Sequence, residues 1–207
     1  MAPASQTGKF ITLEGVDGAG KSTHIPWIAE RLREAGREVL VTREPGGTPL
    51  AESLREMVLT RAMGAVTETL LMFAARADHV TKVISPALER GAWVVCDRFT
   101  DATLAYQGAG KGVDARLIAQ LSRAAHPALE PDRTFVFDCP YEVSRQRLGT
   151  AGRTLDRFES EAQSFFERVR GAYRAQALAA PGRVKLLDAT RSIAELQAAI
   201  ASHLVFD

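Results

Sequence analysis

A glycine-rich stretch with one lysine and two hydroxyl residues lies near the start of the chain, where it could hold phosphate. The stretch GVDGAGKS satisfies the pattern G-x-x-x-x-G-K-[ST] without a gap. Its glycines let successive backbone N–H groups turn toward phosphate oxygens, the lysine reaches the β- and γ-phosphates, and the serine hydroxyl ligates Mg²⁺. The pattern predicts a nucleotide-binding site made of Gly15, Val16, Asp17, Gly18, Ala19, Gly20, Lys21, Ser22 and Thr23.

A second pair of charged residues follows a later apolar run and is suited to another phosphate. Asp97 and Arg98 come directly after the segment AWVVC. An aspartate at this place is positioned like the acid that assists Mg²⁺ in phosphoryl transfer. The neighbouring arginine could clamp a phosphate with two parallel hydrogen bonds. The plainer alternative for both residues is an ion pair at the end of a strand.

Two more segments carry groups that could recognise a small acceptor molecule. The turn TREPGGT contains Glu44 and Pro45, and its proline and glycines favour a rigid turn, in which we expect a cis Glu44–Pro45 bond. In LLMFAARADH, Phe73 and Arg76 are three residues apart and share one helix face. The ring could stack on a base and the guanidinium could bond to its rim. Without the other motifs, a core Phe and a surface Arg would be the favoured interpretation.

The segment DATLAYQGAGKG places a hydroxyl, an amphipathic ring and an amide on one helix face. Thr103, Tyr106 and Gln107 have the spacing i, i+3 and i+4, which brings their side chains together. These groups are suited to an uncharged heterocycle. On its own, this triple indicates little.

The elements that must position these groups follow from hydrophobic periodicity. Long stretches with helical periodicity separate five short apolar runs, and unbroken apolar runs are typical of parallel strands covered on both faces. The pattern predicts a doubly wound α/β domain in which ligands collect at the carboxyl ends of the strands. The predicted strands are 10–14, 38–42, 92–97, 134–138 and 184–188.

A first helix after the glycine-rich stretch ends near Gly36, and six further helices are predicted. Pro86 is expected to end or bend the helix that contains it. We expect one domain over 1–207, with 1–8 as a loose tail. The six further helices are expected near 50–60, 66–90, 113–125, 140–148, 158–179 and 192–204.

Bulk composition excludes several classes of function. The 207 residues carry a formal net charge of only +1, so charge gives no case for binding nucleic acid or an anionic membrane. No apolar run reaches the roughly 18 residues that a membrane span needs. Cys96 and Cys139 stand in apolar runs, which favours two reduced thiols in a cytoplasmic protein over a disulfide.

A phosphate-binding loop alone does not distinguish a switch, a motor and a kinase. A regulatory GTPase would read guanine with an Asn-Lys-x-Asp motif, and this chain contains no asparagine. An ATPase that acts as a conformational switch would need no second pocket, whereas the remaining motifs favour one.

Taken together, the motifs resemble those of the thymidylate kinase family, bacterial type. They run in the family's order from ITLEGVDGAGKST through TREPGGT, FAAR, VVCDRFTDATLAYQGAGKG, EPDRTFVFD and LDRFE to LLDAT. The resemblance implies the fold of P-loop nucleoside-monophosphate kinases, a five-stranded parallel sheet with helices on both faces. It also implies transfer of the γ-phosphoryl group of ATP to dTMP, with Mg²⁺ as cofactor and a homodimer formed through helices of 66–125.

The resemblance also assigns roles to single residues. Lys21 and the loop backbone hold ATP, and Ser22 and Asp97 belong to the Mg²⁺ site. Asp17 lies near the acceptor, and Arg98 binds its phosphate. For the thymidine part of the acceptor, the implied residues are Glu44, Pro45, Phe73, Arg76, Thr103, Tyr106 and Gln107.

Two of these roles carry a specific expectation. Tyr106 packs under the sugar and disfavours a 2′-hydroxyl, while Thr103 and Gln107 read edges of the base. In many members of the family the stacking aromatic stands four residues before the arginine, where this chain has Met72. Phe73, three residues before, lies on the same side of the helix, and we expect it to take the stacking role.

A lid is expected over about 147–161, because a kinase that admits water would hydrolyse ATP. This stretch holds Arg153 and Arg157, which we expect to be catalytic, since the phosphate-binding loop has no basic residue among its variable positions. The alternative is a solvated loop with ordinary surface charges. For the whole chain, the alternatives are a P-loop kinase for another nucleoside or nucleotide, and the switch ATPase.

Overall fold

Five parallel strands form one sheet in the computed structural model, which describes residues 8–150, 158 and 162–204. Their spatial order is β2-β3-β1-β4-β5. Each expected strand is confirmed, with its ends within one residue of those expected. The strands are β1 (Phe10–Gly15), β2 (Val39–Arg43), β3 (Trp93–Asp97), β4 (Arg133–Asp138) and β5 (Val184–Asp188).

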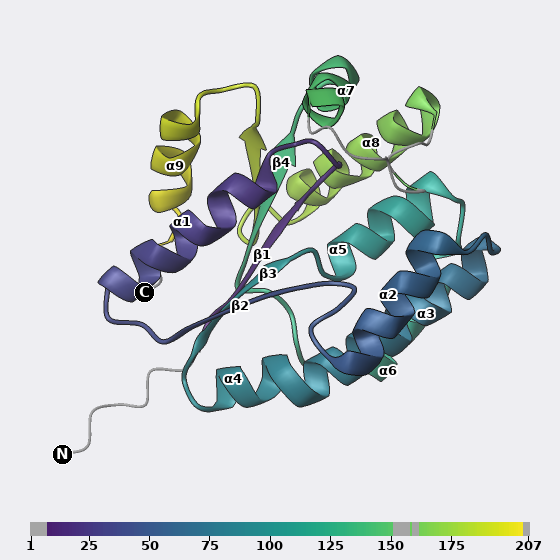
Figure 1. Cartoon of the computed structure of the whole chain (residues 1–207), viewed down its shortest axis with the longest axis horizontal. Coiled ribbons are helices and arrows are strands. Elements are labelled where there is room, and N and C mark those ends of the chain that lie inside the picture. Colours follow the sequence, from purple (N-terminus) through teal and green to yellow (C-terminus); the bar gives the residue numbers. More distant parts are fainter. Residues whose placement is uncertain (1–7, 151–157, 159–161, 205–207) are drawn as a thin grey trace.

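Helices cover both faces of the sheet, which is why its central strands are mostly apolar. Figure 1 shows α1 (Lys21–Glu34) and α9 (Ile193–Ala201) on one side, and α4 (Ser85–Glu89), α5 (Thr100–Thr103) and α8 (Gln163–Ala179) on the other. All six residues of β1 are buried. Burial of both faces holds the carboxyl ends of β1 and β3 side by side, where the glycine-rich loop and the Asp97–Arg98 pair begin.

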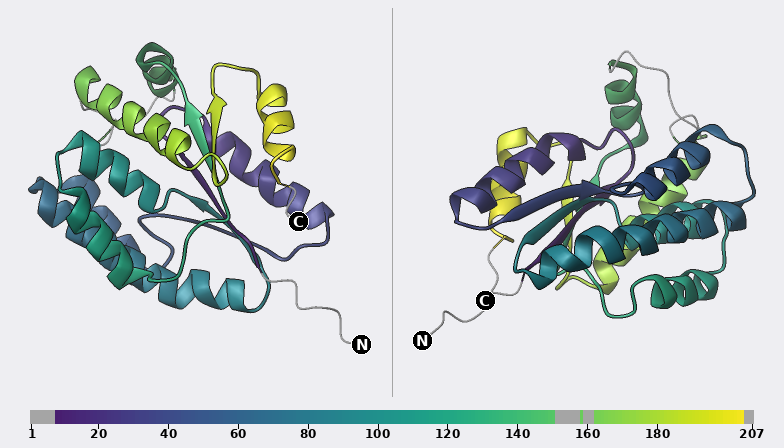
Figure 2. Two further views of the ribbon diagram at one scale, coloured as in Figure 1. Left: turned by 180° about the vertical axis from the view of Figure 1, so that it is seen from behind. Right: turned by 60° about the horizontal axis from the view of Figure 1, so that its bottom comes forward.

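A second group of helices stands outside the sheet layer. It consists of α2 (Pro49–Thr60), α3 (Ala65–His79) and α6 (Ala115–Ala125), and both α2 and α6 pack on α3. The views in Figure 2 show α2 and α3 lying side by side, away from α1 and α9. The remaining helix, α7 (Tyr141–Thr150), stands above the carboxyl ends of the strands.

Two expected helices differ from the observed ones. In the stretch 66–90, α geometry ends at His79 and a π-helical segment, Val80–Ile84, precedes α4, where Pro86 occupies the first turn. The π segment shifts the hydrogen-bond register before the proline, whose missing N–H costs little at that position. The expected helix 158–179 begins only at Gln163 as α8.

The segment that carries Thr103, Tyr106 and Gln107 is helical, as their spacing requires. However, α5 continues into a second π-helical stretch, Leu104–Gly110. Such stretches are rare and occur frequently at functional sites. The Glu44–Pro45 peptide bond is cis, as expected. Within the described residues, no helix combines the length and the apolar composition that crossing a membrane requires.

Candidate functional site

The glycine-rich loop between β1 and α1 is shaped by backbone conformations that favour glycine. Gly18 has φ of 75°, and a Cβ added there would lie 2.6 Å from the Ser144 carbonyl oxygen. Gly20 has φ of 99° immediately before the first turn of α1. The Ser144 hydroxyl of α7 donates to the Asp17 carbonyl over 2.7 Å and so holds the loop from above. The loop therefore ends at a helix N-terminus, an arrangement that attracts anions.

A cavity of about 560 Å³ opens over this loop. Most of the loop residues predicted to bind ATP line it, but Gly15 and Val16 do not. Their carbonyl oxygens instead accept hydrogen bonds from the Lys21 ammonium, over 3.1 and 3.2 Å. The cavity is lined by Asp17, Gly18, Ala19, Gly20, Lys21, Ser22, Thr23, His24, Asp97, Arg147, Leu148, Ala189, Arg191, Ile193 and Leu196.

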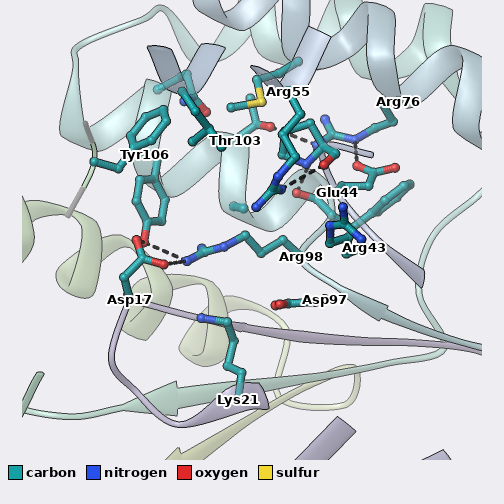
Figure 3. A pocket seen from close by; sticks show the side chains of 17 residues that line it. Asp17, Lys21, Arg43, Glu44, Arg55, Arg76, Asp97, Arg98, Thr103 and Tyr106 are labelled. Carbon is teal, nitrogen blue, oxygen red and sulfur yellow. Dashed lines mark hydrogen bonds and ion pairs between the residues drawn. The ribbon is translucent and has the colours of Figure 1, made fainter. Parts of the chain in front are cut away.

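A second cavity, of about 430 Å³, adjoins the first (Figure 3). Three residues, Asp17, Lys21 and Asp97, line both cavities. A molecule in each cavity would therefore meet the other at these side chains. The second cavity is lined further by Arg43, Glu44, Pro45, Arg55, Leu59, Met72, Arg76, Arg98, Phe99, Ala102, Thr103, Tyr106, Gln107 and Phe158.

Arg98 projects from the end of β3 across the second cavity (Figure 3). Its φ of 69° is a left-handed conformation that is costly for a residue with a Cβ and that clusters at functional sites. The guanidinium donates to Asp17 over 2.6 Å and to the Tyr106 hydroxyl over 3.1 Å. Burial opposes ionisation of Asp17, yet the charges of Arg98 and Lys21 outweigh it and lower the Asp17 pKa.

Two further buried groups support Arg98 from below. Its guanidinium donates to the Tyr173 hydroxyl over 3.3 Å, and that hydroxyl donates to Glu14 over 2.8 Å. Burial, followed by the charge of Asp101, raises the pKa of Glu14 to about 8. No local pattern predicts a role for Glu14 or Tyr173, because the contact between them joins residues 159 positions apart.

Arg76 points into the same cavity from α3 and is 3% exposed. It donates to Glu44 over 2.6 Å and to the Thr103 hydroxyl over 3.1 Å. His79 donates to the second oxygen of Glu44 over 3.0 Å, so both carboxylate oxygens are held. Among the described residues, Arg76 Nη1 has no hydrogen-bond partner. A buried guanidinium nitrogen without an acceptor favours a ligand oxygen at this place.

The expectation that Phe73 faces the acceptor is wrong. Met72 lines the cavity, whereas Phe73 is packed with Val113 and with Ile118 of α6. Neighbouring helix positions differ by about 100°, and this rotation moves Phe73 from the cavity to the interface with α6. Its ring still lies 4.7 Å from the Arg76 guanidinium, so it supports that side chain from outside the cavity.

The other residues expected at the acceptor lie together. Glu44, Pro45, Thr103, Tyr106 and Gln107 all line the second cavity. Arg153 and Arg157 lie outside the described residues.

Arg55 lines the second cavity and was missed. It donates to the Pro45 carbonyl over 2.9 Å. In the sequence it is one of several charged residues on an amphipathic helix, and no motif distinguishes it.

The donor set at the junction of the cavities fits a magnesium ion carried by nucleotide phosphates. Asp97 Oδ1 is buried and has no hydrogen-bond partner among the described residues. Ser22 lines the first cavity together with Asp97. The described ranges contain no cluster of three or more His, Cys, Asp or Glu side chains that could hold a metal.

Comparisons with known proteins match one family along nearly the whole chain. A family profile described as thymidylate kinase matches residues 13–200. Thymidylate kinase of Bordetella petrii is 58% identical over 197 residues, which cover 95% of this chain and 95% of that protein. Its Pseudomonas fluorescens counterpart is 57% identical over 201 residues, 96% of this chain and 95% of that one. A crystal structure of thymidylate kinase from Ehrlichia chaffeensis superimposes with a TM-score of 0.78 at 33% identity, covering 96% and 99% of the two chains.

Proposed function

We propose that this chain, which belongs to the thymidylate kinase family and transfers the γ-phosphoryl group of ATP to dTMP, holds ATP in the cavity over the glycine-rich loop and dTMP in the neighbouring one. The observation that carries this assignment is the shared wall of Asp17, Lys21 and Asp97. In-line transfer requires the donor and acceptor phosphates to meet, and of the residues that the structure describes only these three line both cavities.

The proposed chemistry is positioning and charge neutralisation. An acceptor phosphate is already a nucleophile at neutral pH, so no strong general base is required. Lys21 would stay in contact with the phosphoryl group during its transfer, because this side chain lines both cavities. Arg98, together with Arg55 of α2, would bind the dTMP phosphate. Asp17 then exchanges its contact with Arg98 for one that places the acceptor.

The remaining residues of the second cavity are proposed to hold the nucleoside. Arg76 Nη1 would donate to a carbonyl oxygen of thymine, and Thr103 and Gln107 face other parts of the base. Tyr106 would pack against the sugar, next to the turn of Glu44 and Pro45.

Ser22 and Asp97 are proposed to receive Mg²⁺, which would neutralise charge on the β- and γ-phosphates when bound with ATP. The orphaned Asp97 Oδ1 supports this role. Ser22 and Asp97 would hold the ion where the two cavities adjoin.

The substrate assignment predicts a clear order of acceptors. With ATP and Mg²⁺, dTMP should be phosphorylated far better than dCMP, dAMP, dGMP or thymidine. We expect dUMP to be a poorer acceptor by roughly 10-fold, because a missing methyl in an apolar pocket costs about 1–3 kcal/mol. A coupled assay of ADP release across these six compounds measures the order. Equal turnover of dCMP and dTMP would contradict the base-reading role, and ADP release without any acceptor would favour the switch ATPase.

We also propose a homodimer. Several large apolar side chains on α2 and α3 are exposed to solvent. They are Leu50, Met57, Val66 and Leu70, each 36% to 51% exposed. A surface patch of this kind is typical of a protein–protein interface. A second copy of the chain is the proposed occupant.

Replacement of Val66 and Leu70 by Glu should convert a dimer, of twice the chain mass of 22.5 kDa, into a monomer. The charges would be buried without partners in the interface. Size-exclusion chromatography with light scattering gives the mass. Leu178→Glu is the matched control, since Leu178 is 83% exposed on α8. A wild-type chain of monomeric mass at micromolar concentration would refute the dimer.

One domain, 1–207, is proposed to carry both cavities, and its proposed location is the cytoplasm. Both cysteines, Cys96 and Cys139, are free and buried, which agrees with a reducing compartment. No nucleic acid or membrane partner is proposed.

A further inference from the structure

A buried carboxylate lies directly behind the base-reading amide of the second cavity. Glu68, in the first turn of α3, has no exposed surface. It accepts a hydrogen bond from Gln107 Nε2 over 2.8 Å. The Lys111 ammonium donates to both of its oxygens, over 2.9 and 2.8 Å. The three residues therefore connect α3 to the π-helical stretch Leu104–Gly110 and the residue after it.

This contact determines which end of the Gln107 amide faces the ligand. An ionised carboxylate only accepts hydrogen bonds, so Gln107 must turn its NH₂ group toward Glu68. Gln107 is 2% exposed and lines the acceptor cavity. In the described ranges no donor reaches Gln107 Oε1, which is therefore the polar atom left for a ligand. Without Glu68 the amide could rotate by 180° about its terminal bond at little cost.

The orientation matters because thymine and cytosine have opposite hydrogen-bonding edges. Thymine presents N3–H as a donor and O4 as an acceptor, whereas cytosine presents N3 as an acceptor and an amino group as a donor. Opposite N3, Gln107 Oε1 can accept a hydrogen bond from thymine but repels the N3 lone pair of cytosine. Arg76 Nη1, held in place by Glu44, makes the same distinction at O4.

We propose that Glu68, charge-paired with Lys111, is a positioning residue that makes the acceptor site selective for a base with a protonated N3, because it fixes the acceptor end of Gln107 toward the cavity. The inference rests on the proposed placement of dTMP in this cavity. It assigns the choice between thymine and cytosine to a residue that does not line the site.

The test is the ratio of kcat/KM for dTMP to kcat/KM for dCMP. In Glu68→Gln, the new amide can donate as well as accept, so Gln107 is free to turn. We expect the ratio to fall by at least about 10-fold, while KM for ATP stays within about twofold, because a hydrogen-bonding mismatch is what separates the two bases. Glu38→Gln is the matched control, since Glu38 forms an exposed ion pair with Arg90.

A second variant covers the case in which Glu68→Gln does not fold. Glu68→Met with Lys111→Met removes both charges together, which buried pairs tolerate better than the loss of one partner. It also leaves Gln107 without its fixed acceptor, so the ratio should again fall. Melting temperature and ATP binding show whether each variant is folded.

A mutant cycle separates positioning from a general structural effect. In a Gln107→Met background, Glu68→Gln should change the ratio by less than about twofold, since Glu68 acts through Gln107. A parallel loss of activity on dTMP and dCMP, with the ratio unchanged, would overturn the inference. A further fall of the ratio in the Gln107→Met background would also overturn it. Failure of the wild-type chain to phosphorylate dTMP would instead refute the proposed function.

Discussion

Replacement of Arg98 by Ala should lower kcat/KM for dTMP by about 10²–10³-fold and leave the affinity for ATP nearly unchanged. The guanidinium lies in the second cavity and is absent from the first, and the loss of a charged partner from a buried phosphate contact costs about 2–5 kcal/mol. Titration calorimetry with each nucleotide separately measures the two affinities. Loss of ATP binding with unchanged dTMP binding would show that Arg98 binds ATP and that its assignment to the dTMP site is wrong.

Two controls refine this result. Arg43→Ala removes another arginine of the same cavity, but one that is paired with Glu52 over 2.8 Å at the exposed rim, and its effect should be much smaller. Arg98→Lys keeps a positive charge and loses the planar fork, so it should recover only part of the acceptor affinity. Both variants keep a Cβ at the substituted position, so differences in backbone freedom do not contribute to the measured differences in acceptor affinity.

Removal of both expected lid arginines, Arg153 and Arg157, should lower kcat by roughly 10²–10⁴-fold with little change in the melting temperature. Charge that develops on the transferred phosphoryl group usually needs an arginine beyond the lysine and the metal. Among the described arginines of the ATP cavity, Arg147 donates to the carbonyls of Ala19 and Ala189, and Arg191 is paired with Asp188. The two expected arginines, which lie outside the described residues, are therefore the proposed source.

Single and double variants separate the two arginines. Arg157 matches the family pattern within LDRFE more closely, so Arg157→Ala alone should account for most of the loss. Single-turnover kinetics at saturating ATP and dTMP report the chemical step, and a melting curve reports stability. A double variant whose kcat stays within about threefold of the parent would contradict the lid assignment, and Arg43 or Arg191 would be the next residues to test.

The sequence predicts strands and loops well where short-range physics decides them. The apolar runs at the centre of the sheet form strands because burial on both faces favours apolar residues, whereas the edge strands β2 and β5 are partly exposed. The glycine-rich loop needs φ values that its glycines provide. Asp97 and Arg98 reached the site because parallel strands bring their carboxyl ends to one edge.

Predictions from the sequence are wrong or missing where the position of a side chain depends on contacts with residues distant along the chain. Whether Met72 or Phe73 faces the cavity depends on how α3 is rotated by its packing on α6, about 40 residues later. The roles proposed for Arg55 and Glu68 depend on α2, α3 and the π-helical stretch packing together, and neither position carries a local pattern. The π-helical geometry of Val80–Ile84 likewise depends on packing and on the following Pro86, and hydrophobic periodicity alone does not predict it.

Buried charge behind the acceptor cavity has a consequence for how this chain tolerates heat. Glu44 with Arg76, and Glu68 with Lys111, are ion pairs in which the acid is at most 3% exposed. Well-packed apolar residues in place of such pairs are often neutral or stabilising by about 1–4 kcal/mol. These pairs therefore need not stabilise the fold, and the desolvation cost that they impose falls as the temperature rises. Under the role proposed for Glu68, joint apolar replacement of both partners would leave the melting temperature unchanged or higher and would still lower the selectivity for thymine.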